Sequence, residues 1–393
     1  MPVHARIVAA AGYVGSMIQG NGSAPASMDR WYFPGRWRDA GHVAGLFPPQ
    51  EQTWELDPAV GLTPQALKRV CRESVQVPFD QAARAINEDW GTRFDGKHMQ
   101  RWSEHVGQQA VALREAERKA YQKKGRRPAA SKVTGNLLVI GMDGGRMQSR
   151  ERVTGSESRW REDKIATISL CQKGDGVEQD PRRLATTYTA TLGNSRIFGT
   201  LARVEAERCG IRQVQEAIVI GDGAAWIDTI AKEHFGAHER IVDYYHAAER
   251  LCDCAKALYP NNPRRVAKEL QGHLYQGRLR RVLKWLAKKS KSLGKVRPSD
   301  PVNHPRRVLG ENNGYFQKHQ DQMNYPRYRA KGWPIGSGVT ESGVKLFNKR
   351  VKGTEQFWSR GGGEAILALR ALRLSQDGRW DNFLLHRKLR PAA

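Results

Sequence analysis

Two short stretches of the chain place an aspartate among glycines at the end of an apolar run. Asp143 lies in LLVIGMDGGR and Asp222 in AIVIGDGAAW. Each apolar run is typical of a strand buried on both faces, where an unpaired charge is costly. Carboxylates at the ends of neighbouring strands repel unless they share a proton or a cation, and Mg²⁺ is the usual cation where phosphate is the substrate. We expect the glycines to leave room for a metal and a nucleic-acid backbone. Asp-Gly is also a common turn, so only the repeated context favours a functional site.

A third carboxylate would complete a two-metal site, which stabilises the attacking and the leaving oxygen of an in-line displacement. The best candidate is Glu341, which follows WPIGSG near the start of an expected helix. Glu355 and Glu364 are rivals, but neither follows a Gly-Ser-Gly stretch. A glutamate early in a helix also simply complements the helix dipole. The cations that follow Glu341 and suit phosphate groups are Lys345, Lys349, Arg350 and Lys352.

The charge balance indicates a polyanionic partner. The 393 residues include 65 Lys and Arg against 40 Asp and Glu, a net charge of +25. Nucleic acid is the first candidate, because Lys and Arg contacts to phosphates release counterions. Five cysteines, none in C-x-x-C spacing, indicate a reducing compartment. No apolar run approaches the length of a membrane span, so we expect a cytoplasmic protein without a membrane partner.

The elements that position the carboxylates begin at residue 136. Apolar and β-branched patterns predict the order β-β-β-α-β-α-β over residues 136–246, which is an α/β class with a mixed sheet. A basic helical segment follows at 247–332. Between Lys256 and Arg307 it has 15 Lys and Arg and two acids, so it supplies 13 of the 25 net charges. Residues 333–393 contain the Glu341 helix and an amphipathic C-terminal helix.

The N-terminal part is predicted to be separate from the sheet. Residues 1–58 are rich in Gly, Pro and Trp and read as irregular. Residues 59–117 give helix, helix, short turn and helix, the outline of a helix-turn-helix, although any three-helix bundle has the same pattern. Residues 118–135 read as a basic linker. In a DNA-binding module, the third helix would present Lys97, His98, Gln100 and Arg101 to the bases.

Several stretches together resemble bacterial insertion-sequence DDE transposases of the ISKra type. They are GMDGGR, VIGDGAAWI, DYYHAAERL and the segment from IGSGVTESG to DGRWDNF, and the resemblance covers roughly residues 60–385. It implies an RNase H-like core with a helical insertion before the last catalytic helix. The DDE triad then maps onto Asp143, Asp222 and Glu341, and the separation of 119 positions between the last two (341 − 222) accommodates the insertion. Many such transposases have a Cys-rich zinc segment near the N-terminus, and this chain has none.

The resemblance also covers a D-x-x-H motif, Asp243 to His246, as an assisting element beside the site. His246 could orient a ligand or touch the scissile phosphate, but a strand-end Asp and His satisfied by the next helix is the simpler interpretation. Trp226 could stack on an extruded base, although a Trp in an amphipathic helix is more often part of the core.

The sequence therefore predicts a DDE transposase. Asp143 would bridge two Mg²⁺ ions, for which Mn²⁺ would substitute, while Asp222 and Glu341 hold one each. The partners would be duplex DNA at the transposon ends and the target, with at least a dimer on DNA and a location at the bacterial nucleoid. The alternatives are an RNase H-like nuclease without strand transfer and a non-catalytic, domesticated DNA-binding protein. The insertion residues expected on DNA are Arg264, Arg265, Lys268, Arg278, Arg280, Arg281, Lys284, Lys288 and Lys289.

Overall fold

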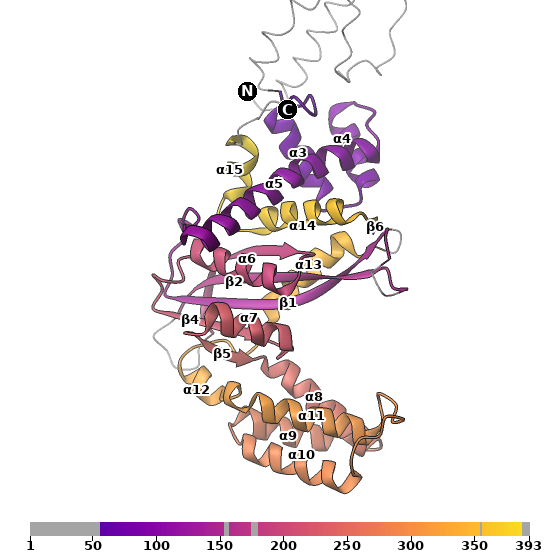
Figure 1. Cartoon of the computed structure of the whole chain (residues 1–393), viewed down its shortest axis with the longest axis vertical. Coiled ribbons are helices and arrows are strands. Elements are labelled where there is room, and N and C mark those ends of the chain that lie inside the picture. The colour runs from indigo at the N-terminus through magenta and orange to yellow at the C-terminus, as the bar shows by residue number, and fades with distance from the viewer. Residues whose placement is uncertain (1–55, 153–156, 174–179, 354–355, 387–393) are drawn as a thin grey trace, which may run out of the picture. The chain divides into compact units, whose positions relative to one another are not determined.

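The computed structural model describes residues 56–152, 157–173, 180–353 and 356–386. These residues belong to two compact units, one within Met1–Gln108 and Trp380–Ala393 and one within Gln109–Arg379 (Figure 1). The segment 1–58, expected to be irregular, lies almost entirely outside the described residues. The sheet and the candidate site belong to the second unit.

The first unit contains the helices expected at 59–117. Thr63 caps α3, because its Oγ1 accepts a hydrogen bond from the Ala66 amide at 3.3 Å. Gly91, with φ of 65°, ends α4. The third helix continues to Lys124, so the expected linker begins as helix, which the strong helix formers in RKAYQKK explain. The helices are α3 (Pro64–Ser74), α4 (Phe79–Trp90), α5 (Gly96–Lys124), which belongs to this unit only as far as Gln108, and the short α15 (Arg379–His386), which belongs to it from Trp380.

The second unit is built on a mixed sheet in the spatial order β3-β2-β1-β4-β5. The first three strands form an antiparallel meander, and β4 and β5 run parallel to β1. A two-residue strand, β6, pairs with the far end of β1. The strands are β1 (Leu137–Ser149), β2 (Trp160–Gln172), β3 (Arg182–Thr191), β4 (Glu216–Gly221), β5 (Glu239–Val242) and β6 (Phe357–Trp358).

The two faces of the sheet have different helical covers. The side chains of Leu138, Ile140 and Met142 pack with α6 and α7 on one face. The alternate residues of β1, from Leu137 to Gly145, lie on the other face, which α13 covers at its centre. Asp143 belongs to this second set. These helices are α6 (Ser195–Arg208), α7 (Ala225–Phe235), α13 (Gly338–Val351) and α14 (Arg360–Leu374), the last packed against β3.

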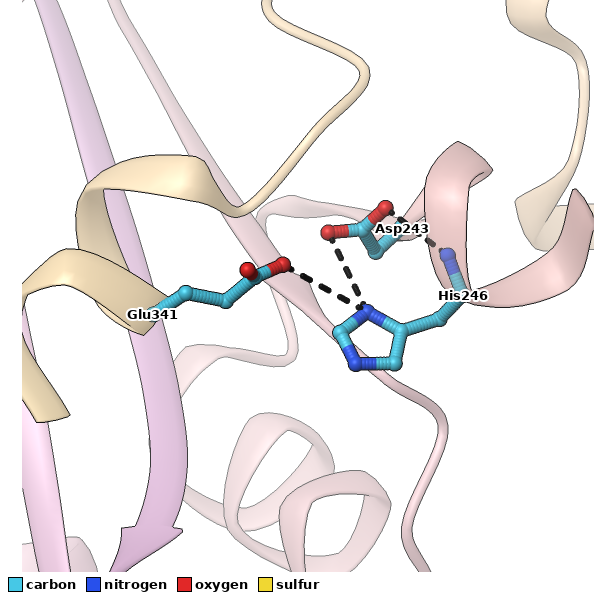
Figure 2. Close-up of side chains that lie close together, drawn as sticks. All are labelled: Asp243, His246 and Glu341. Atoms are coloured by element: carbon cyan, nitrogen blue, oxygen red, sulfur yellow. Dashed lines mark hydrogen bonds and ion pairs between the residues drawn. The ribbon is translucent and has the colours of Figure 1, made fainter. Parts of the chain in front are cut away.

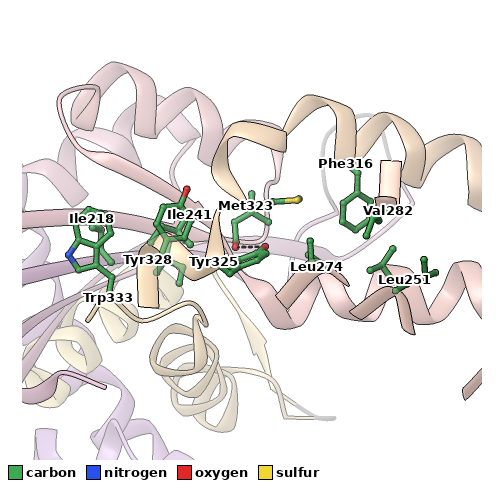
Figure 3. Packing of buried hydrophobic residues seen from close by; sticks show 14 of the residues in the cluster. Ile218, Ile241, Leu251, Leu274, Val282, Phe316, Met323, Tyr325, Tyr328 and Trp333 are labelled. Atoms are coloured by element: carbon green, nitrogen blue, oxygen red, sulfur yellow. Dashed lines mark hydrogen bonds between the residues drawn. The ribbon is translucent and has the colours of Figure 1, made fainter. Parts of the chain in front are cut away.

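The basic segment between β5 and α13 is helical, as expected, and shares its core with the sheet. One hydrophobic cluster runs from Ile218 and Ile241 through Tyr325 to Leu251 and Phe316 (Figure 3). The Tyr325 hydroxyl donates to the carbonyl of Val242 at 3.1 Å, which fixes the insertion to the end of β5. The helices are α8 (Tyr244–Leu258), α9 (Pro263–Tyr275), α10 (Leu279–Leu293), α11 (Pro305–Lys318) and α12 (Tyr325–Ala330), with a 3₁₀ turn, η2 (Gln320–Gln322).

The structure confirms the expected α/β class with a mixed sheet. The expected order of strands and helices over 136–246 is also observed, with one change. The stretch RIVDYYH was expected to be a strand, but β5 ends at Val242 and α8 begins at Tyr244, because Asp243 caps the helix. No helix in the described part of the chain is both long and apolar enough to cross a membrane.

A buried ion pair offers a test of this fold. The Arg379 guanidinium forms two hydrogen bonds with the Glu205 carboxylate, at 2.6 and 2.9 Å. Burial alone would raise the pKa of Glu205, but Arg379 lowers it to about 2. The pair should therefore stabilise the protein fully above the unfolded-state pKa of 4.5, and this contribution should be lost as the pH falls towards 2.

We expect Glu205→Gln to lower the free energy of unfolding by about 2 kcal/mol at pH 7, because it removes one of the two buried carboxylates, Glu205 and Asp377, that bond to Arg379. The loss should shrink below pH 4. Urea unfolding followed by circular dichroism measures it, and Glu311→Gln on the exposed face of α11 is the control. An equal effect of Glu205→Gln at pH 7 and pH 3 would contradict the assignment.

Candidate active site

Asp143 and Asp222 come from neighbouring parallel strands of the sheet. Asp143 lies in the middle of β1, so its expected position at the end of a strand is wrong, whereas Asp222 directly follows the last residue of β4. The last pair between β1 and β4 is Gly141 with Ile220, and each aspartate lies two residues beyond that pair. The charge of Asp222 raises the pKa of Asp143, so the two carboxylates are near each other.

Glu341 reaches the sheet because α13 packs closely on it. Thr340 lies over Gly141, and its Oγ1 is 2.8 Å from that of Thr167 on β2. A Cβ on Gly141 would collide with Thr340, and a Cβ on Gly343 would meet Thr167 and Tyr188 at 3.0–3.1 Å. Small residues on both elements thus allow the close approach that places Glu341, the next residue of α13, near Asp143.

The three acids act on one another electrostatically. Burial raises the pKa of Asp143, a hydrogen bond from the Gly144 amide at 2.6 Å lowers it, and the charges of Asp222 and Glu341 raise it again. His246 is the nearby cation that lowers it. The net shift is upward, so the ionised form of Asp143 is held at a cost in free energy. Carboxylates in this condition favour a cation between them.

Asp243 and His246 link the start of α8 to the helix that carries Glu341 (Figure 2). One oxygen of Asp243 accepts from the amides of Tyr245 and His246, at 2.6 and 3.2 Å. The other accepts from the amide of Ser337 at 2.6 Å and from its hydroxyl. His246 Nδ1 lies 3.4 Å from Asp243 Oδ2 and 3.9 Å from Glu341 Oε1.

These contacts determine the ionisation of the pair. Burial would raise the pKa of Asp243, but the donors from His246 and Ser337 lower it. The contact with Asp243 raises the pKa of His246 to about 9, so the imidazole is a cation at neutral pH. The simpler interpretation, a strand-end Asp and His satisfied by the next helix, therefore accounts for Asp243, which caps α8. It does not account for His246, which also contacts Glu341. Ser337 was missed by the sequence analysis, although the Gly-Ser-Gly stretch signalled it.

The arrangement of ligand atoms differs from the one expected. In the described residues, the three ligand atoms within 4.8 Å of one another belong to Asp243, His246 and Glu341. This group suits a metal poorly, because both oxygens of Asp243 already accept hydrogen bonds. Asp143 and Asp222 do not join Glu341 in a group of that spacing among the described residues, so metal binding by the triad stays a prediction. The donor set of the triad nevertheless fits Mg²⁺, since it offers hard oxygens whose mutual repulsion a cation would relieve.

The glycines beside the aspartates do not have the expected role. A Cβ on Gly145 would lie 2.7 Å from Asp163 Oδ2 and 2.9 Å from Asn348 Oδ1. A Cβ on Gly223, whose φ is 83°, would lie 3.0 Å from Cε2 of Tyr315. Protein side chains, and not open space, lie against Gly141, Gly145 and Gly223. The prediction of clearance for a nucleic-acid backbone is therefore wrong at these three positions.

Two other candidates have structural roles. Trp226 packs on the cluster under α6 and α7, edge to face with Phe198 at 5.7 Å between ring centroids, and Lys164 Nζ lies 5.6 Å from its ring. Glu364 accepts from Thr191 Oγ1 at 2.6 Å and from the amide of Leu192 at 2.7 Å, which joins α14 to the end of β3. Glu355 lies outside the described residues.

The residues of α5 and α13 that were expected to contact DNA differ in their exposure to solvent. Lys97 and Arg101 are exposed, whereas His98 bonds to Asp95 at 2.6 Å and Gln100 to Glu104 at 2.8 Å. Arg350 is only 1% exposed and packs on the Trp358 ring, so its expected place on a phosphate-binding surface is wrong. Burial lowers its pKa to about 9. The remaining cations of α13 and its end are exposed, namely Lys345, Lys349 and Lys352.

The cations of the insertion are at the surface. Eight of the nine predicted residues are exposed and Lys289 is partly exposed. They lie on α9, on α10 or at the turn between these helices, whose apolar residues Leu270, Leu274, Val282 and Leu286 point into the core. The insertion therefore combines an apolar inner side with a cationic outer side.

Comparison with models of known protein families gives no match, and comparison with curated proteins also gives none. The functional argument therefore depends on the geometry and chemistry of this chain's own residues.

We expect Asp143→Asn to stabilise the protein. The folded-state pKa of Asp143 is raised, so its ionisation destabilises the fold at neutral pH, and the substitution should raise the free energy of unfolding by about 0.5–2 kcal/mol. The gain should disappear as the pH falls below the unfolded-state pKa of 3.8. Urea unfolding at pH 7 and pH 3 tests this, and a loss of stability at pH 7 would contradict it.

We expect the opposite sign for Asp243→Asn. An amide nitrogen in place of one oxygen would face the amide and hydroxyl of Ser337, which are donors, so the free energy of unfolding should fall by about 1–3 kcal/mol. Asp222→Asn is the matched control, because its only described acceptor bond, from the Ala224 amide at 2.8 Å, survives in asparagine. Equal stability of the two variants would show that Asp243 does not hold the site together.

Proposed function

We propose that the protein is a DDE transposase of an insertion sequence, which binds transposon ends and catalyses DNA cleavage and strand transfer. The observation that carries the proposal is the position of Asp143 on β1 and of Asp222 just beyond the end of the parallel strand β4, with α13, which carries Glu341, packed on the same sheet. The electrostatic coupling of these three acids at Asp143 supports it.

An RNase H-like core is part of the proposal. The resemblance to ISKra-type transposases implies such a core with a helical insertion before the last catalytic helix. The mixed sheet, the helices between β5 and α13, and Glu341 on α13 agree with this arrangement. The insertion separates the second and third acids in the sequence, and its hydrophobic cluster returns the chain to the sheet.

The chain's own residues have distinct roles in this proposal. Asp143, Asp222 and Glu341 would hold two Mg²⁺ ions, which activate the attacking oxygen and stabilise the leaving oxygen of an in-line displacement at phosphorus. His246 positions the Glu341 carboxylate, and Asp243 orients His246. In cleavage, water attacks the phosphorus and the 3′-oxygen leaves. In strand transfer, that 3′-hydroxyl attacks the target phosphate and another 3′-oxygen leaves.

The basic surfaces support DNA as the substrate. A net charge of +25, concentrated on the outer side of the insertion, attracts phosphates and releases their counterions. The exposed Lys97 and Arg101 suit the same partner. Two transposon ends must meet for strand transfer, so the proposal includes at least a dimer on DNA, in the cytoplasm at the nucleoid.

The experiment is strand transfer in vitro with DNA that carries the short inverted repeats flanking the gene, in Mg²⁺ or Mn²⁺. Asp143→Asn, Asp222→Asn and Glu341→Gln should each reduce cleavage by roughly 10³-fold, because each removes several kcal/mol of transition-state stabilisation. Glu355→Gln and Glu364→Gln compare the rival acids, of which Glu355 should be dispensable for cleavage. For Glu364→Gln, melting temperature must be read as well, since that residue bonds to β3.

Each alternative function predicts a different outcome of this experiment. Cleavage without end specificity or joining would identify a nuclease of the same metal-dependent kind. DNA binding with all three acids dispensable would identify a non-catalytic DNA-binding protein. Full cleavage and joining by Asp143→Asn and Asp222→Asn would refute the assigned site.

A further inference from the structure

Two exposed tyrosines lie next to the candidate active site. Tyr245 is 65% exposed, although it directly precedes His246 in the chain. Tyr275, at the end of α9, is 39% exposed. Burying an aromatic ring normally stabilises a protein, so a large exposed ring beside an active site indicates a binding role.

The Tyr245 ring is held in place by its neighbours. It packs edge to face on Tyr244, with 5.4 Å between ring centroids and 76° between ring planes. On another side it lies against Gly336, where a Cβ would be only 2.6 Å from Cε2 of the ring. Gly336 directly precedes Ser337, the partner of Asp243, so the contacts that fix Glu341 also fix this ring.

Tyr244 connects the two exposed rings. Its own ring is partly buried and packs edge to face on Tyr275 at 5.5 Å and on the buried Tyr325 at 5.2 Å. The guanidinium of Arg329, on α12, lies 3.9 Å from the centroid of Tyr275. Rings and a guanidinium plane therefore follow one another from the carboxylates towards α9 and α12.

The surroundings of these rings are cationic. Arg278 and Arg280 follow Tyr275 and are exposed, and Lys331 follows Arg329 at the end of α12. Aromatic rings with interleaved cations are typical of surfaces for unpaired nucleic acid, because every base has a stacking face and every nucleotide has a phosphate. A paired duplex offers its backbone to such a surface, but its bases are stacked on one another.

We propose that Tyr245 and Tyr275 form a stacking track for an unpaired stretch of DNA that leads away from the candidate active site. The proposal rests on the proposed function in taking DNA as the substrate. It adds that the strand near the reacting phosphate is single-stranded and that Tyr245 positions its base.

The test measures binding without chemistry. The full-length chain with Asp143→Asn, in EDTA, is titrated with a duplex that carries a single-stranded extension of about six nucleotides, and with the blunt duplex. A 2-aminopurine in the extension reports stacking by loss of its fluorescence. We expect the extension to bind more tightly than the blunt duplex and its fluorescence to be quenched.

In this background, Tyr245→Ala and Tyr275→Ala should each weaken binding of the extended DNA by about tenfold, the effect of losing roughly one base stack, and reduce the quenching. Binding of the blunt duplex should change less than about twofold. Tyr245→Phe should retain both affinity and quenching, since it keeps the ring. Val302→Ala, at an exposed apolar position of the α10–α11 loop, is the control for a general surface change.

Unchanged affinity and quenching in both alanine variants, with unchanged melting temperature, would overturn the track. So would an equal loss for extended and blunt DNA in a folded variant. If strand transfer fails in the wild-type chain but the tyrosine-dependent quenching is present, the proposed function is wrong and the track stands. If strand transfer occurs without such quenching, the function stands and the track is wrong.

Discussion

The buried carboxylate of Asp243 is the constraint on which the site depends. It is 0% exposed and accepts hydrogen bonds from the first turn of α8 and from Ser337, the residue just before α13. The amide of Tyr244 also donates to the carbonyl of Ile335 at 2.8 Å. The chain leaves the sheet after β5 and returns at α13, so these bonds join the two ends of the insertion. The junction therefore works together with the packing of α13 on the sheet to hold Glu341 near Asp143.

The site contains two aspartates in opposite electrostatic conditions. Asp243 has donors on both oxygens, so its charge is stabilised although it is buried. Asp143 has one described donor, Gly144, and acidic neighbours, so its charge is disfavoured. His246 partly offsets this excess of negative charge. A fold that holds acids together against their repulsion sacrifices stability at this point, as binding sites for cations commonly do.

Local patterns were sufficient to predict the order of strands and helices along the chain from residue 136, because buried strands have recognisable apolar runs. Contacts between distant residues were not predictable. Position 141 requires glycine because Thr340 lies over it, and position 145 because Asp163 and Asn348 lie over it. The sequence alone suggested instead that these glycines leave room for a ligand. Arg350 lies on the same helix as the exposed Lys349, and only the position of Trp358 explains why it is buried. The position of Glu341 near Asp143 likewise depends on contacts between distant residues and could not be predicted from local patterns.

Helix geometry explains why the D-x-x-H spacing brings Asp243 and His246 into contact. Asp243 is the N-cap of α8 and His246 is its third helical residue, two positions that lie on the same side of a first turn. The cap can therefore accept from the backbone and still contact the imidazole at 3.4 Å. The two intervening residues must then point elsewhere. Tyr244 packs into the aromatic cluster and Tyr245 faces solvent, so the spacing that orients His246 also directs one ring inward and one outward beside the same carboxylates.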